Sequence, residues 1–110
     1  MAKDIQEDGK CTVSLVGFDE LDEEEIEQAK KILSTHVSKL ENKTDNGALK
    51  IRLKMHKHNK NFVHELEADF FVSGGKNFSA NASDKNLYKA LASTMSKLIS
   101  EVEHNSRKEK

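Results

Sequence analysis

Apolar and polar residues alternate in four short stretches of the chain, and this period of two is typical of half-buried β-strands. The four predicted strands lie in residues 12–16, 49–56, 62–72 and 77–82. Between the last two strands stand Gly74 and Gly75, which can adopt the positive φ angles that a two-residue hairpin turn requires. A polar loop, residues 57–61, separates the second and third strands. We therefore expect three consecutive strands joined by short connections.

Two other segments repeat their apolar residues with the period of an amphipathic α-helix. The first helix is predicted from near Asp22 to near Asn42, and its acidic first turn suits the positive end of the helix dipole. Its apolar stripe consists of Ile26, Ala29, Leu33, Val37 and Leu40. The second helix is predicted over residues 83–103, with Ser83 as the N-cap. Its apolar stripe consists of Leu87, Leu91, Met95, Leu98 and Val102.

The order of these elements is strand, helix, three strands, helix. Because each strand is apolar on one face and each helix on one stripe, the economical packing is a four-stranded sheet with both helices on one face. The sequence thus predicts an α+β fold of β-α-β-β-β-α order, with the other sheet face in water. Residues 1–10 lack periodicity and are expected to be a disordered leader, 11–104 a single domain, and 105–110 a basic polar tail.

On the outer sheet face, antiparallel pairing of the second and third strands would set three cations against three anions. The cations are Lys50, Arg52 and Lys54, and the anions are Glu65, Glu67 and Asp69. We expect this complementarity to fix the register of the two strands and to leave little free charge on that face.

Composition narrows the class of protein. The chain has 110 residues, of which 34% are charged, and a mean hydropathy of −0.73. No apolar run approaches the roughly 20 residues that span a bilayer, and no secretory signal precedes Cys11. Cys11, the single cysteine, has no partner for an internal disulfide, which favours a reducing compartment. We expect a cytoplasmic protein that does not enter membranes.

The net charge of −1 conceals an uneven distribution. Residues 1–48 carry 6 basic and 12 acidic side chains, whereas residues 49–110 carry 12 basic and 7 acidic ones. A cationic surface in the second half is therefore compatible with the near-neutral total, and such surfaces attract nucleic acid through its phosphates. Interleaved charge that merely keeps the protein soluble is the alternative interpretation.

Residue patterns for catalysis are missing from the sequence. It contains neither a glycine-rich phosphate loop followed by Lys-Ser/Thr nor a Gly-x-Ser-x-Gly motif. We expect no enzyme, no cofactor and no small-molecule substrate. His56, His58 and His64 make a zinc site conceivable, but a third ligand would have to come across the hairpin, so we expect no metal. Histidines among Lys57 and Lys60 more plausibly add hydrogen-bond donors to a basic tip.

Four short motifs carry a resemblance to a known family. They are Ser38-Lys39-Leu40-Glu41, Val72-Ser73-Gly74-Gly75, Asn86-Leu87-Tyr88-Lys89-Ala90-Leu91 and Ser96-Lys97-Leu98. Their residues and spacing resemble those of the ribosome hibernation-promoting factors, also called ribosome-associated inhibitors. The resemblance implies a fold akin to a double-stranded-RNA-binding domain. It also implies binding to small-subunit rRNA in the tRNA and mRNA channel, which silences idle ribosomes under stress. The chain is similar to the short members, which lack a dimerising domain, so we expect a monomer away from the ribosome.

The resemblance places RNA contacts on the basic helix surfaces. Lys39, Lys97 and Lys108 stand at basic positions of the family. The outward face of the second helix is rich in lysine and serine, whose ammonium and hydroxyl groups suit phosphate oxygens. The complete set of expected RNA-binding residues is Lys30, Lys31, Lys39, Lys85, Lys89, Lys97, Arg107 and Lys108. A solvated helix face is the alternative interpretation of the same residues.

Two aromatic residues are weighed in the same way. Tyr88 is expected at the edge of the core with a solvated hydroxyl, and Phe71 as an exposed residue of the outer sheet face rather than a stacking platform.

The alternative function is a protein-interaction module that uses the acidic first helix and the mixed-charge sheet. A continuous positive strip across both helices would favour RNA, whereas separate acidic and basic poles would favour a protein partner.

Overall fold

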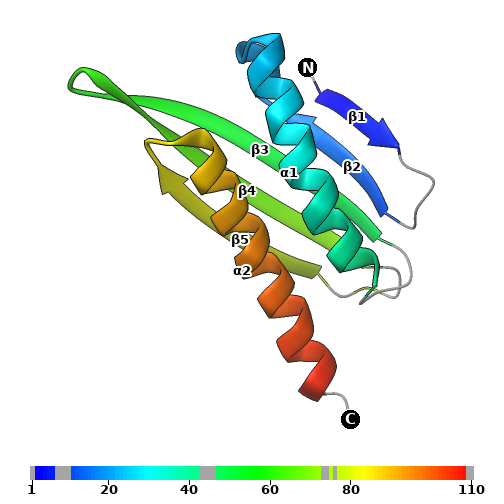
Figure 1. Ribbon diagram of the computed structural model, residues 1–110. Coiled ribbons are helices and arrows are strands. Elements are labelled where there is room, and N and C mark those ends of the chain that lie inside the picture. The colour runs from blue at the N-terminus through cyan, green and yellow to red at the C-terminus, as the bar shows by residue number, and fades with distance from the viewer. Residues whose placement is uncertain (1, 7–10, 43–46, 73–74, 76, 109–110) are drawn as a thin grey trace.

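The computed structural model describes residues 2–6, 11–42, 47–72, 75 and 77–108 as a five-stranded sheet with two helices on one face (Figure 1). The elements in chain order are β1 (Ala2–Gln6), β2 (Cys11–Val16), a 3₁₀ turn η1 (Phe18–Glu20), α1 (Glu23–Glu41), β3 (Gly47–His58), β4 (Asn61–Val72), β5 (Asn77–Asp84) and α2 (Leu87–Lys108). The predicted α+β class and the β-α-β-β-β-α order of residues 11–108 are confirmed.

The strands follow one another across the sheet in the order β1-β2-β3-β4-β5. β2 and β3 are parallel because α1 crosses over between them, and all other neighbours are antiparallel. In Figure 1, α1 lies over β2 and β3 and α2 lies over β4 and β5, with both helices running in the same direction. Both helices therefore begin at the same end of the sheet.

β1 is an addition to the predicted fold. It pairs antiparallel with β2, from Ala2 opposite Val16 to Gln6 opposite Thr12. The expectation of a disordered leader is thus wrong for residues 2–6, while residues 1 and 7–10 lie outside the described part. An edge strand bonds through its backbone and gives β2 a second neighbour, so it needs no apolar alternation in its own sequence. The expected tail is also shorter than predicted, because α2 continues to Lys108.

α1 begins and ends where the sequence predicts. The Asp22 carboxylate accepts a hydrogen bond of 2.8 Å from the Glu25 amide, and the Glu25 side chain accepts one of 3.1 Å from the Asp22 amide. This reciprocal capping box satisfies two amides at the start of the helix. The C-cap is Asn42. All five residues of the predicted apolar stripe are buried: Ile26, Ala29, Leu33, Val37 and Leu40.

The core lies between the helices and the sheet. The α2 stripe is buried as predicted, and opposite it β4 contributes Leu66, Ala68 and Phe70. Phe18 in η1 is also buried in this core, at 1% exposure. Gly17, at φ 86°, makes the turn from β2 into η1, and a Cβ atom there would overlap the carbonyl oxygen of Leu53.

The predicted charge ladder between β3 and β4 is confirmed by the register. Lys50 lies opposite Asp69, Arg52 opposite Glu67 and Lys54 opposite Glu65. The predicted polar loop over residues 57–61 is wrong, however, because pairing continues to His58 opposite Asn61. Only Asn59 and Lys60 form the turn, with Asn59 at φ 59°, a left-handed conformation that asparagine tolerates. The resulting hairpin extends beyond the helices (Figure 1).

The connection between β4 and β5 is longer than the predicted two-residue turn. Pairing ends at Phe71 opposite Asn77. Gly75 has the expected positive φ, 101°, and its amide donates a hydrogen bond of 3.1 Å to the Val72 carbonyl. Gly74 lies outside the described residues.

Candidate RNA-binding surface

The exposed face of α2 is a surface of lysine and serine. Its members on the helix are Lys89, Ser93, Ser96, Lys97 and Ser100, all exposed. Residues 85–100 include no aspartate or glutamate, and the nearest acids that follow are Glu101 and Glu103. We call these five residues together with Lys85 the α2 Lys/Ser face. It combines positive charge with hydroxyl donors over four helical turns, which suits a phosphate backbone.

The helix α2 begins later than predicted, and its start determines where Lys85 and Lys89 lie. Ser83 still belongs to β5, opposite Glu65, so it does not cap the helix. Instead the Asn86 side chain accepts hydrogen bonds from the amides of Tyr88 (2.9 Å) and Lys89 (3.1 Å). The Asp84 carboxylate in turn accepts one of 2.8 Å from the Asn86 amide. Lys85 therefore lies in the bend before the helix and Lys89 in its first turn.

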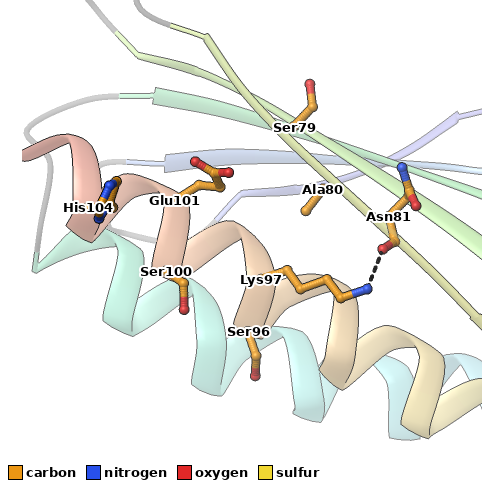
Figure 2. Close-up of a pocket in the computed structure, with 8 residues that line it drawn as sticks. All are labelled: Ser79, Ala80, Asn81, Ser96, Lys97, Ser100, Glu101 and His104. Atoms are coloured by element: carbon orange, nitrogen blue, oxygen red, sulfur yellow. Dashed lines mark hydrogen bonds between the residues drawn. The ribbon is translucent and has the colours of Figure 1, made fainter.

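A groove runs between α2 and β5, with a volume of about 680 Å³ (Figure 2). Its lining residues are Ser79, Ala80, Asn81, Ser96, Lys97, Ser100, Glu101 and His104. Lys97 reaches across it and donates a hydrogen bond of 3.1 Å from Nζ to the Asn81 carbonyl oxygen. The Lys97 ammonium therefore lies on the β5 flank of the Lys/Ser face, while Ser96 and Ser100 point away from β5 (Figure 2). With Glu101 also present, the groove itself carries mixed charge.

The basic residues of α1 form a weaker surface. Lys30, Lys31 and Lys39 are all exposed, but the first turns of the same helix carry several exposed acids. A shallow pocket of about 420 Å³ joins these acids to α2 and is lined by Glu24, Glu27, Gln28, Lys31 and Tyr88. Of the three lysines, Lys39 lies farthest along the chain from the acidic end, in the last turn of the helix.

Tyr88 lies beside the acidic N-terminal end of α1 and is affected by its negative charge. Its side chain is half-buried at the edge of the core, as predicted. Burial, followed by the charges of Glu25, Asp22 and Glu24, raises the pKa of the Tyr88 hydroxyl above its ordinary value. The positive surface is therefore not continuous across the N-terminal ends of both helices, because acids of α1 lie beside the start of α2.

The remaining expected RNA-binding residues are at the end of α2. Arg107 and Lys108 fall in its last turn, and their side chains lie outside the described part. The structure thus brings Lys85, Lys89 and Lys97 onto one helix side and places Lys30, Lys31 and Lys39 on the neighbouring helix.

The outer sheet face is mixed in charge, and its side chains form hydrogen bonds with one another. His56 Nε2 lies 2.9 Å from a carboxylate oxygen of Glu65, and the Ser79 hydroxyl donates a hydrogen bond of 2.9 Å to Asp69. Phe71, 45% exposed, lies on this face beside these groups, as predicted. The cations of this face, Lys50, Arg52 and Lys54, each lie opposite an acid of β4, so their charge is offset.

One exposed aromatic residue was missed by the sequence reasoning. Phe62, 53% exposed, lies near the tip of the β3–β4 hairpin, directly opposite Lys57. The signal that could have found it is the run of residues 54–64, which contains three lysines and three histidines but no acid. The basic tip was expected; its aromatic residue was not.

Within the described residues, no group of three or more histidine, cysteine, aspartate or glutamate side chains could hold a metal ion. His56 and His64 lie on opposite faces of the sheet, because Glu65, which bonds His56, is the neighbour of His64 along β4. Of the helices in the described part, none is long and apolar enough to cross a membrane.

No family model matches the chain, and no curated protein matches it.

Proposed function

We propose that this protein binds structured RNA of the small ribosomal subunit through the α2 Lys/Ser face and silences translation in the cytoplasm. The observation that carries the proposal is the acid-free run of exposed lysine and serine residues along four turns of α2. The sequence resemblance to ribosome hibernation-promoting factors supplies the ribosomal partner. Both helices cover one sheet face, as that resemblance implies, and α2 keeps exposed residues along the side that faces away from the sheet.

The binding mode follows from the residue types. Lysine neutralises phosphate as a point charge, and a serine hydroxyl donates to a phosphate oxygen. Side chains on the outer face of a helix cannot enter the deep, narrow major groove of A-form RNA. Binding by this face should therefore depend on salt and on RNA shape rather than on base sequence.

The test compares two double variants that remove the same charge from different faces. Lys85→Gln with Lys89→Gln removes two cations from the α2 Lys/Ser face, and Lys50→Gln with Arg52→Gln removes two from the outer sheet face. The first variant should lose co-sedimentation with small subunits at a lower salt concentration. Its log–log salt slope should fall by roughly 1.4–1.8, since each phosphate contact contributes roughly 0.7–0.9. The second variant should sediment as the parent does, and the parent, but not the first variant, should inhibit cell-free translation.

A protein-interaction module is the second candidate, favoured by the acidic pocket beside Tyr88. The variant Glu24→Gln with Glu27→Gln, which removes both acids that line the pocket, separates the two functions. If α2 binds RNA, this variant binds small subunits at least as tightly as the parent, because it loses repulsion towards phosphate. If the pocket binds a basic protein segment, the same variant loses that partner, and Lys85→Gln with Lys89→Gln behaves as the parent does in sedimentation with subunits.

A further inference from the structure

The tip of the β3–β4 hairpin is a projection of the sheet whose two strands stay paired. Backbone pairing continues to His58 opposite Asn61, so only two residues form the turn. The projecting part extends beyond the start of α2 (Figure 1). A side chain near the tip therefore stands clear of the helices but is held by a complete strand ladder.

Burial falls off along this hairpin towards its tip. On the helix side of the sheet, Leu53 and Leu66 are buried, the next pair, Met55 and His64, is half-buried, and Phe62 is 53% exposed. Phe62 is thus an aromatic ring outside the core. A single exposed apolar residue is common on protein surfaces, so the ring alone is no site.

The Phe62 ring is flanked by positive charge. Lys57 lies directly across the ladder from Phe62, and Lys60 is in the turn two residues before it. Both lysines are exposed, and residues 54–64 contain no acid. Aromatic rings flanked by cations are the combination that binds unpaired nucleotides, because the ring stacks on a base while the cations contact its phosphates.

We propose that Lys57, Lys60 and Phe62 form a second RNA contact, in which one unpaired base stacks on Phe62 and the adjacent phosphates contact the two lysines. This inference rests on the proposed function and extends it from paired RNA backbone to an unpaired nucleotide. The two contacts lie at the same end of the molecule. His64 is opposite Asp84, which precedes Lys85, and Phe62 lies about 7 Å farther along β4.

A second copy of the chain is a poor occupant of the tip. Two tips carry the same positive charge and would repel each other. One exposed ring also offers far less apolar area than the roughly 1,200–2,000 Å² that a stable interface buries. An acidic protein segment would satisfy the charge, so it becomes an outcome of the test.

The chain contains no tryptophan, so a single introduced one is a specific reporter of stacking. Phe62→Trp places the reporter at the tip, and Phe71→Trp is the matched control, because Phe71 is 45% exposed at the other end of β4. The probes are an RNA stem with one unpaired adenosine, a fully paired stem of equal length, and poly-glutamate. We expect the unpaired adenosine to quench the Phe62→Trp fluorescence, the paired stem to quench it less, and neither RNA to change the Phe71→Trp fluorescence.

Affinity provides the second measurement. Phe62→Leu keeps an apolar side chain but removes the ring, and it should weaken binding of the stem with the unpaired adenosine about 5- to 100-fold while leaving the paired stem unchanged. If this variant bound the stem with the unpaired adenosine as tightly as the parent does, and Phe62→Trp showed no quenching, the inference would be overturned. If Lys85→Gln with Lys89→Gln still weakened binding of both stems, the proposed function would stand without it.

Two other results distinguish failure of the proposed function from failure of this inference alone. A parent protein that binds neither RNA nor small subunits would overturn the proposed function together with this inference. Quenching of Phe62→Trp by poly-glutamate but not by RNA would assign the tip to an acidic protein partner and overturn the inference alone.

Discussion

The Nζ atom of Lys97 donates a hydrogen bond to the main-chain carbonyl oxygen of Asn81, with 3.1 Å between the two atoms. β5 is the last strand of the sheet, so its outward backbone groups have no neighbouring strand. Such edges are templates for unwanted strand pairing, and a lysine at the edge opposes it. Lys97 therefore ties α2 to the sheet edge in addition to contributing positive charge.

This bond predicts that Lys89 and Lys97 contribute unequally to RNA binding. The Lys89 ammonium makes no such bond to the described residues, so it is free to contact phosphate, whereas Lys97 must first release Asn81. We expect Lys89→Gln to lower the salt slope of RNA binding by roughly 0.7–0.9, and Lys97→Gln to lower it by less than half as much. Binding titrations across a range of salt concentrations measure both slopes. A larger effect of Lys97→Gln would show that its bond to Asn81 does not restrain it.

The start of α2 provides a matched pair of substitutions. Asn86→Ala removes the side chain that accepts hydrogen bonds from the Tyr88 and Lys89 amides, and this should cost about 1 kcal/mol of the free energy of unfolding. Ser83→Ala changes an exposed strand position and should cost less than about 0.5 kcal/mol. Urea unfolding of both variants gives the comparison. Equal losses would mean that the cap is not at Asn86.

Elements whose periodicity, caps and charges agree were predictable from the sequence. Asp22 and Glu25 are spaced as a capping box ahead of an apolar stripe, and the structure has that box. The alternating cations and anions of β3 and β4 predicted a register in which Arg52 meets Glu67, and that register is present. In each case local pattern and tertiary packing favour the same answer.

The differences arise where tertiary structure overrides a local signal. Ser83 is a residue type that commonly caps helices, but it pairs with Glu65 and belongs to β5. Asn86 caps the helix in its place. β1 has no apolar alternation because it bonds at the sheet edge through its backbone. The candidate site was predicted residue by residue on α2. The bond of Lys97 depends on β5 being the edge strand, and the exposure of Phe62 depends on how far the hairpin extends; periodicity encodes neither.

The buried face of α2 can be tested at its centre. Leu91 is fully buried, so Leu91→Ala should lower the free energy of unfolding by about 2–5 kcal/mol through lost burial and a residual cavity. Ser93→Ala, on the exposed face of the same helix, is the control and should change it by less than about 0.5 kcal/mol. Thermal or urea unfolding measures both. An unchanged stability of Leu91→Ala would mean that α2 packs through another face.

The acidic end of α1 should be visible in the titration of Tyr88, the single tyrosine of the chain. Burial and then the charges of Glu25, Asp22 and Glu24 raise its pKa above the ordinary value near 10, so the folded protein holds the phenol proton more tightly than the unfolded chain does. The stability that this group contributes is complete below the unfolded pKa and is lost as the pH rises through the folded one. Glu25→Gln removes the charge that raises the pKa most, and glutamine preserves the capping box, so the variant should have a Tyr88 pKa closer to that of the denatured protein. Tyrosinate absorbance measured in parent, variant and denatured protein tests this. Identical titrations of parent and variant would show that the charge of Glu25 does not raise the Tyr88 pKa.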